Sequence, residues 1–155
     1  MRVAPMPVTL EADGNAATDG QKIYVNPQWM AGVEASAGEG GVRFVMAHEL
    51  GHANQGMGGG HAAELNADRF AARSIARQGY DFDVVQQTMS RLNQTSTKTH
   101  PGAGQRLTNA KKEYHSEQKI EHESFMHVTR KRRTRTKIPV TRRADRNKLQ
   151  RENAL

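Results

Sequence analysis

The stretch MAHELGHANQG, residues 46–56, carries two histidines four residues apart, with a glutamate beside the first. In an α-helix, residues i and i+4 share one face, so the imidazoles of His48 and His52 can reach a common point. A tetrahedral zinc ion requires this of two protein ligands, and Glu49 would lie where it can contact a metal-bound water. The same spacing also occurs by chance, so a zinc site and a pair of ordinary helix histidines are alternatives at this stage.

A catalytic zinc ion needs a third protein ligand and one open position. The segment HAAELNADRFAARSIARQ, residues 61–78, follows the glycine-rich break GMGGG and is expected to form a helix that folds back. Its Glu64 and Asp68 are again four residues apart, so one carboxylate can bind a metal while the other accepts the N–H of a ligating histidine. An exposed acidic stripe is the alternative for this pair. His61 is a rival third ligand, although it comes late, after a flexible glycine run.

Composition narrows the classes of protein to which the chain can belong. The chain has 155 residues and no cysteine, which excludes disulfide staples and leaves His, Asp and Glu as the strong metal ligands. No apolar run approaches the ~18 residues of a membrane span, and the first residues lack the apolar core of an export signal. We therefore expect a cytoplasmic protein without a membrane span, with delivery by a virion or a secretion system as an open alternative.

Turn signals and apolar spacing predict an α+β domain. Between residues 8 and 26, two Asp-Gly pairs flank short extended pieces, which predicts a small antiparallel sheet. Gly40-Gly41 is expected to end a loop, and Asp83 is expected to cap a helix, while Gly79 is expected to close the preceding one. Helices are predicted over residues 42–55, 61–78, 84–94 and from 106 to about 122.

The positive charge gathers at the C-terminal end of the chain. Residues 111–155 contain 14 Lys and Arg against 6 Asp and Glu, whereas residues 1–110 contain 9 against 10. From Arg130 onward the chain is basic and nearly free of large apolar residues, so we expect it to be disordered or ordered only on a partner. This predicts a folded domain at 1–123 and a flexible basic tail at 124–155. The tail could contact nucleic acid or an acidic protein, or only keep the chain in solution.

Four motifs resemble the gluzincin family of HtpX-type heat-shock peptidases and CAAX prenyl proteases. That family pairs H-E-x-x-H with a Glu-x-x-x-Asp on the next helix, preceded by an Asn-Ala element and a strand, and followed by a Thr-His-Pro…Arg segment. In chain order, the matching residues are Asn15-Ala16 with Lys22 to Val25, His48-Glu49-x-x-His52, Glu64 to Asp68 with Gly79-Tyr80-Asp81, and Thr99-His100-Pro101 with Arg106.

The resemblance implies a zinc endopeptidase with a zincin-like fold, here a minimal gluzincin whose small antiparallel sheet packs on the active-site helix. It implies that His48, His52 and Glu64 bind Zn²⁺, that Glu49 is the general base, and that Asp68 supports a ligand from behind. The substrate would be a protein or peptide. Family members usually carry membrane helices or a signal peptide, and often a longer gap than the eleven residues found here between His52 and the glutamate.

Two residues of the last motif have alternative roles. Arg106 or His100 could steady the oxyanion of the reaction, but a structural salt bridge for Arg106 and a helix cap for His100 are equally open. We also expect the strand Ile23–Val25 to offer an edge to extended substrate. The competing function is a non-catalytic binding or structural protein, such as a virion or nucleoprotein component, that acts through its basic tail on a peptidase-like scaffold. A zinc-stabilised regulator without turnover is a third, weaker alternative.

Overall fold

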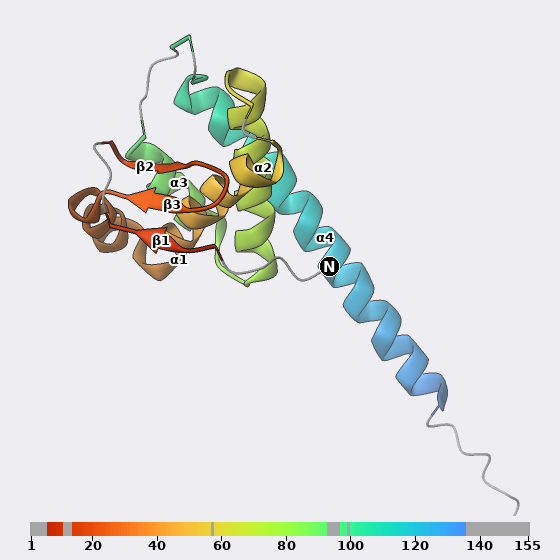
Figure 1. Ribbon diagram of the computed structural model, residues 1–155. Helices are drawn as coiled ribbons and strands as arrows, with labels where there is room; N and C mark the ends of the chain where they lie inside the picture. Colours follow the sequence, from red (N-terminus) through yellow and green to blue (C-terminus); the bar gives the residue numbers. More distant parts are fainter. Residues whose placement is uncertain (1–5, 11–13, 57, 93–96, 99, 136–155) are drawn as a thin grey trace, which may run out of the picture. The chain divides into compact units, whose positions relative to one another are not determined.

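The computed structural model describes residues 6–10, 14–56, 58–92, 97–98 and 100–135. In these ranges the chain forms a small three-stranded sheet and four helices (Figure 1). No helix in the described ranges has the length and apolar character needed to cross a membrane. The elements are β1 (Val8–Thr9), β2 (Ala16–Thr18), β3 (Ile23–Val25), α1 (Pro27–Asn54), α2 (His61–Arg77), α3 (Phe82–Ser90) and α4 (Ala103–Arg135).

The sheet is built on the hairpin of β2 and β3, whose turn is held by Asp19. Its Oδ1 accepts the backbone N–H groups of Gln21 and Lys22 at 2.8 and 2.7 Å. The strand order is β1-β3-β2, with β2 antiparallel and β1 parallel to β3. The prediction of an antiparallel sheet was therefore wrong for β1: β3 lies between two strands that run in opposite directions. Because both β1 and β2 pair with β3, Ile23–Val25 is the central strand and not the expected free edge, and β1 and β2 form the edges of the described sheet.

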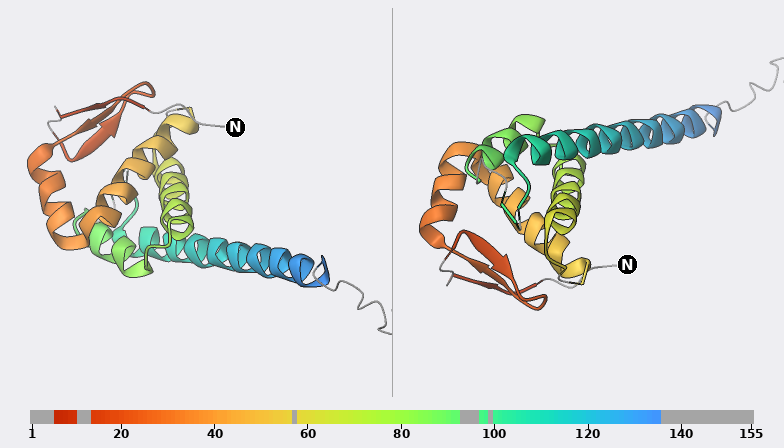
Figure 2. Two further views of the ribbon diagram at one scale, coloured as in Figure 1. Left: turned by 90° about the horizontal axis from the view of Figure 1, so that it is seen from below. Right: turned by 90° about the horizontal axis from the view of Figure 1, so that it is seen from above.

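Helix α1 begins fifteen residues before the predicted start because Asn26 provides a cap. Its side-chain oxygen accepts the N–H groups of Gln28 and Trp29 at 3.0 and 3.1 Å, and Pro27 fills the first turn. Gly38 interrupts the helix with φ 62° and ψ −163°. Figure 2 shows the two parts of α1 diverging from this kink as the arms of a V, with the sheet across the open side.

The glycines that follow the kink lie inside the helix, which corrects the predicted loop at Gly40-Gly41. A Cβ atom on Gly40 would lie 2.9 Å from a methyl group of Val84, and one on Gly41 would lie 2.9 Å from Oγ1 of Thr88. Both neighbours belong to α3. These glycines therefore allow α3 to pack closely on α1, and that gain outweighs the roughly 1 kcal/mol that glycine costs in a helix.

Helices α1 and α2 are in backbone contact at Gly51. A Cβ atom there would lie 2.9 Å from Cα of Ala67, so only glycine allows this approach. Helix α2 presents small side chains, with Ala67, Ala71 and Ala72 fully buried. The contact brings the helix turn that carries His48 and His52 next to the turn of α2 that carries Glu64.

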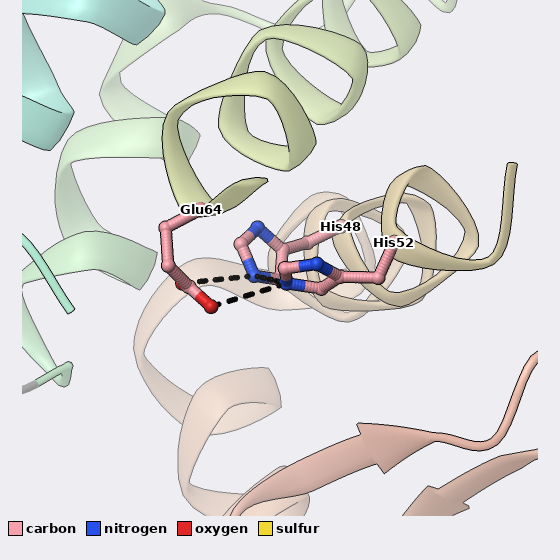
Figure 3. Close-up of side chains that lie close together, drawn as sticks. All are labelled: His48, His52 and Glu64. Carbon is pink, nitrogen blue, oxygen red and sulfur yellow. Dashed lines mark hydrogen bonds and ion pairs between the residues drawn. The ribbon is translucent and has the colours of Figure 1, made fainter. Parts of the chain in front are cut away.

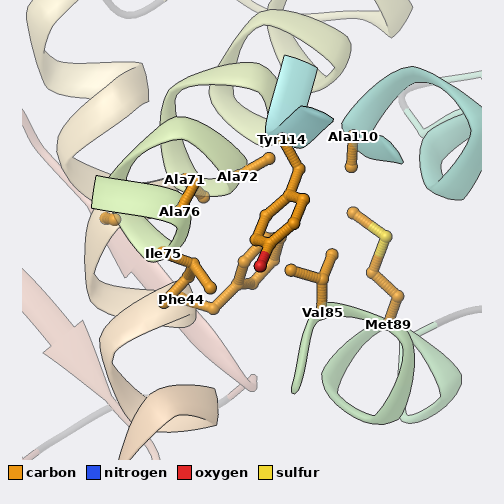
Figure 4. Close-up of a cluster of buried hydrophobic side chains, with 10 residues drawn as sticks. Phe44, Ala71, Ala72, Ile75, Ala76, Val85, Met89, Ala110 and Tyr114 are labelled. Atoms are coloured by element: carbon orange, nitrogen blue, oxygen red, sulfur yellow. The ribbon is translucent and has the colours of Figure 1, made fainter. Parts of the chain in front are cut away.

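The core lies where the second arm of α1 meets α2, α3 and the start of α4 (Figure 4). Phe44, Ile75 and Val85 are essentially fully buried, and Tyr114 donates a hydrogen bond from its hydroxyl to the carbonyl of Tyr80 at 2.7 Å. Gly79 closes α2 at φ 77°, as predicted. Helix α3 begins at Phe82 with Asp81 in the N-cap position, so the prediction of Asp83 as the cap was two residues late.

Helix α4 begins three residues before Arg106 and continues well past the predicted end near His122. No proline or glycine occurs between Gln105 and Arg135, and Glu, Lys and Arg favour a helix, so nothing ends it earlier. The helix thus extends to Arg135, into the segment from Arg130 that was expected to be disordered or ordered only on a partner, and the rest of that segment lies outside the described residues. The predicted division into a domain at 1–123 and a tail at 124–155 stays a prediction. Contacts divide the chain into two units, Met1–Glu121 and His122–Leu155.

Candidate metal centre

Three side chains from α1 and α2 converge on one point (Figure 3). The Nε2 atoms of His48 and His52 lie 3.1 Å apart. The carboxylate of Glu64 reaches both rings, with Oε1 3.2 Å from Nε2 of His52 and Oε2 3.6 Å from Nε2 of His48. Within the described ranges, these residues form the group whose ligand atoms could hold a metal ion together.

The spacing of these atoms fits zinc. Ligands bound at about 2.0–2.2 Å in a tetrahedron lie roughly 3.3 Å from one another. The three separations of 3.1, 3.2 and 3.6 Å lie on both sides of that value. Two imidazoles and one carboxylate also form a donor set that zinc accepts with a fourth position open. The residues present therefore fit the ion that the sequence predicts.

A buried ion pair between Asp68 and Arg106 contacts His48 and Glu64 of this group. Asp68 is fully buried and lies with Oδ1 3.0 Å from Nδ1 of His48, in a contact too bent for a well-formed hydrogen bond. Its two carboxylate oxygens accept hydrogen bonds from Nε and Nη2 of Arg106 at 2.8 and 2.7 Å. The same Nη2 lies 3.4 Å from the carboxylate of Glu64. The arrangement fixes the imidazole of His48 and the carboxylate of Glu64 together.

These contacts shift the pKa values of the group. Burial alone would lower the pKa of His48, but its contacts with Asp68 and Glu64 raise the pKa to about 9. Burial would likewise raise the carboxyl pKa values of Glu64 and Asp68. Contacts with His48 and His52 instead hold the pKa of Glu64 well below its usual range, and Arg106 and His48 lower that of Asp68. Without metal, the site therefore favours a proton on His48 and negative charge on both carboxylates.

The raised pKa of His48 predicts a pH dependence of the metal-free protein. A group whose pKa is higher in the folded state stabilises the fold fully below its unfolded pKa and loses that effect through its folded pKa. In EDTA, the free energy of unfolding should fall by roughly 2–3 kcal/mol between pH 6.5 and about 9, at about 1.4 kcal/mol per pKa unit. Urea titrations at several pH values would measure it.

The matched control for this pH dependence is His48→Gln, which removes the titrating group. Its unfolding free energy should change much less over the same pH range. A wild-type stability that stays level or rises from pH 6.5 to 9 would contradict the assignment. Because a proton and a metal compete for the same imidazole, zinc affinity should rise over this range in the wild type.

Glu49 lies on the wall of a cavity of about 400 Å³ beside the three converging residues. Its side chain is largely buried, and burial raises the pKa of its carboxyl. Both arms of α1 and residues Asn15 to Thr18, which include β2, contribute to the lining of the cavity. Its other lining residues include Trp29, Phe44, Val45, Thr88 and Leu92, which the sequence analysis did not single out. Trp29 is the chain's single tryptophan, which was the one signal that could have drawn attention to it.

The remaining candidate residues lie at different distances from the group. His100 lines the cavity with a half-exposed side chain, and its Nε2 lies 3.5 Å from Oε1 of Glu64. Arg106 also lines the cavity, but its described bonds are those of a salt-bridge partner. His61, the rival ligand, points elsewhere, because its Nε2 lies 2.7 Å from the carbonyl of Thr97.

Helix α2 and the segment that follows it are similar to a known protein family. The family model of peptidase family M48 matches residues 56–114. Residues 56–114 are thus similar to peptidase family M48. This confirms the resemblance for that part of the chain, which contains Glu64, Asp68, His100 and Arg106, whereas the H-E-x-x-H stretch lies just before the matched residues. Comparison with curated proteins and with solved structures found no match.

Proposed function

We propose that the chain is a zinc-dependent endopeptidase of the gluzincin type, with a zincin-like fold. The observation that carries this proposal is the convergence of His48, His52 and Glu64 beside a buried Glu49 at one cavity. The match to a family of metallopeptidases supports it independently. The two observations concern the same group of residues, because the matched segment contains Glu64 and the preceding helix contains both histidines.

In this proposal His48, His52 and Glu64 hold the zinc ion. Bound there, zinc would polarise the peptide carbonyl and lower the pKa of a bound water to ~7. Asp68, whose Oδ1 lies 3.0 Å from Nδ1 of His48, would keep Nε2 of that ring directed at the ion. Arg106 positions Asp68 and Glu64 rather than the substrate.

Glu49 is the general base. Burial raises the pKa of its carboxyl, which makes it a stronger proton acceptor than an exposed glutamate. It would take a proton from the attacking water and deliver it to the leaving amine of the substrate. His100, half-exposed at the cavity, is the residue we propose to donate a hydrogen bond to the oxyanion.

The cavity indicates how a peptide would bind. Residues Asn15 to Thr18 line it, so the edge of β2 can pair with the extended backbone of a substrate. Trp29, Phe44 and Leu92 form an apolar wall within the same cavity, which suits a large apolar side chain of the peptide. We therefore propose a protein or peptide substrate held in an extended conformation.

Metal content and hydrolysis together test this function. The purified wild type should contain about one equivalent of zinc, and His52→Ala should lose it, since two ligands rarely retain the ion. Casein hydrolysis should stop in EDTA and return with added zinc. The matched control is His127→Ala, an exposed histidine that lines no part of the cavity. Equal zinc in His52→Ala and wild type, or a metal-free wild type, would refute the proposal.

A further inference from the structure

Positive charge is concentrated in the second unit of the chain, His122–Leu155. This unit contains eleven Lys and Arg against three Asp and Glu, whereas the preceding 121 residues contain twelve against thirteen. Eight of the eleven cations are arginines. The planar guanidinium of arginine forms paired hydrogen bonds with phosphate oxygens, which the ammonium of lysine does not. The composition therefore favours a partner rich in phosphate.

The charge density at the end of α4 matches that of a nucleic acid duplex. Five of the six residues Arg130–Arg135 are basic, and all six belong to the helix. At about 1.5 Å per residue the six span about 9 Å, which gives one positive charge for about every 1.8 Å. Double-stranded DNA carries one negative charge for about every 1.7 Å of its axis. The linear density of basic residues along this end of the helix is thus close to that of the phosphates along the duplex axis.

The helix that leads into this basic stretch is accessible. Every side chain from His122 to Val128 is exposed, and so is that of Arg130. Phe125 and Val128 expose 65% and 52% of their surface. A large partner can therefore reach it.

The same residues are poorly suited to a membrane surface. A helix that lies on a bilayer keeps its basic and apolar residues on opposite faces. Residues 130–133 are all basic, and four consecutive helix positions, about 100° apart, occupy every side. The apolar residues Phe125, Met126 and Val128 precede this turn, and no apolar residue follows them at positions 130–133. No apolar face thus runs the length of the basic helix.

We propose that the basic end of α4, residues 130–135, binds the phosphate backbone of nucleic acid without sequence preference. Residues 126–155 contain no Phe, Tyr or Trp on which bases could stack, so we expect the contacts to be mainly electrostatic. Phosphate contacts carry no direct sequence information, and their strength falls steeply with salt. This binding is independent of the zinc site and goes beyond the proposed peptidase function.

The test uses the full chain and a fluorescein-labelled 30-base-pair DNA duplex of arbitrary sequence, followed by fluorescence anisotropy. The wild type should bind, and the logarithm of its affinity should fall linearly with the logarithm of the salt concentration. The quadruple variant R130Q/K131Q/R132Q/R133Q should bind about tenfold or more weakly at 100 mM salt, with a slope smaller by about 3, because up to four phosphate contacts are lost. A second duplex of different sequence should bind equally.

The matched control removes four positive charges elsewhere. The variant K22Q/K98Q/K111Q/K112Q changes four exposed lysines of the first unit and should bind DNA nearly as the wild type does. Equal losses in the two quadruple variants would overturn the proposal, because net charge alone would then explain binding. Tighter binding to anionic phosphatidylserine vesicles or to polyglutamate than to the duplex would also overturn it. The basic-segment variant should still cleave casein, so failure of this proposal and of the peptidase function can be told apart.

Discussion

Replacement of Glu49 by Gln should reduce peptide hydrolysis by about 10²–10⁴-fold, the usual contribution of a positioned general base. The amide keeps the size of the side chain and its place on the cavity wall, but it cannot accept a proton. Zinc content should stay at the wild-type value, because the converging ligand atoms belong to His48, His52 and Glu64. Initial rates on casein and metal analysis of the same preparation would measure both quantities.

The control for this prediction is Glu39→Gln, which neutralises an exposed glutamate on the same helix. It should cleave casein at the wild-type rate, since its carboxylate pairs with Arg43 at the surface. If Glu49→Gln hydrolyses casein as fast as Glu39→Gln does, Glu49 is not the base. If it loses zinc as well as activity, the variant reports on the structure of the site instead.

Replacement of Asp68 by Ala should destabilise the fold by about 3–5 kcal/mol, because it removes both close hydrogen-bond acceptors of a buried guanidinium. Arg106 is only 5% exposed and forms both of its close hydrogen bonds with this carboxylate. The pKa of Asp68 is held low by Arg106 and His48, so the pair stays charged at neutral pH. Urea unfolding in EDTA would measure the loss without a contribution from metal binding.

Two further variants separate the causes of that loss. The double variant Asp68→Ala/Arg106→Met removes both charges and should recover much of the stability, since an absent pair costs far less than a broken one. Asp83→Ala, at an exposed position in the first turn of α3, should change stability by less than about 1 kcal/mol. Asp68→Ala should also weaken zinc binding by about 10–100-fold, because His48 loses the carboxylate behind it. If Asp68→Ala alone is as stable as Asp83→Ala, the ion pair of Asp68 and Arg106 does not stabilise the fold as stated here.

The parts of the site that the sequence predicted are those governed by local helix geometry. His48 and His52 share a face, as do Glu64 and Asp68, because residues four positions apart lie on the same side of any α-helix. The turn at Gly79 was likewise predictable, since a positive φ at a helix end favours glycine. That these two faces meet required tertiary information, although the family resemblance anticipated it.

The errors arose where long-range packing overrides local preference. Gly40 and Gly41 have the composition of a loop, and only the approach of α3 explains why they lie in a helix. The pairing of β1 with β3 is parallel because β3, and not β2, lies next to β1. Short segments of alternating polarity do not specify this order of strands. The ion pair of Asp68 and Arg106 joins residues 38 positions apart, so no periodic pattern could have revealed that Arg106 is engaged there.

The contact of Gly51 with Ala67 has a consequence for how such a chain can change over time. The distance between the histidines and Glu64 is set by two helix backbones that touch, and the segment that joins the helices does not determine it. Insertions between Gln55 and His61 would therefore lengthen the connection without moving the ligands. Gly51 itself has no such freedom, because any side chain there would separate the helices. A chain with a much longer connection can thus keep the same ligand geometry, provided that this position stays glycine.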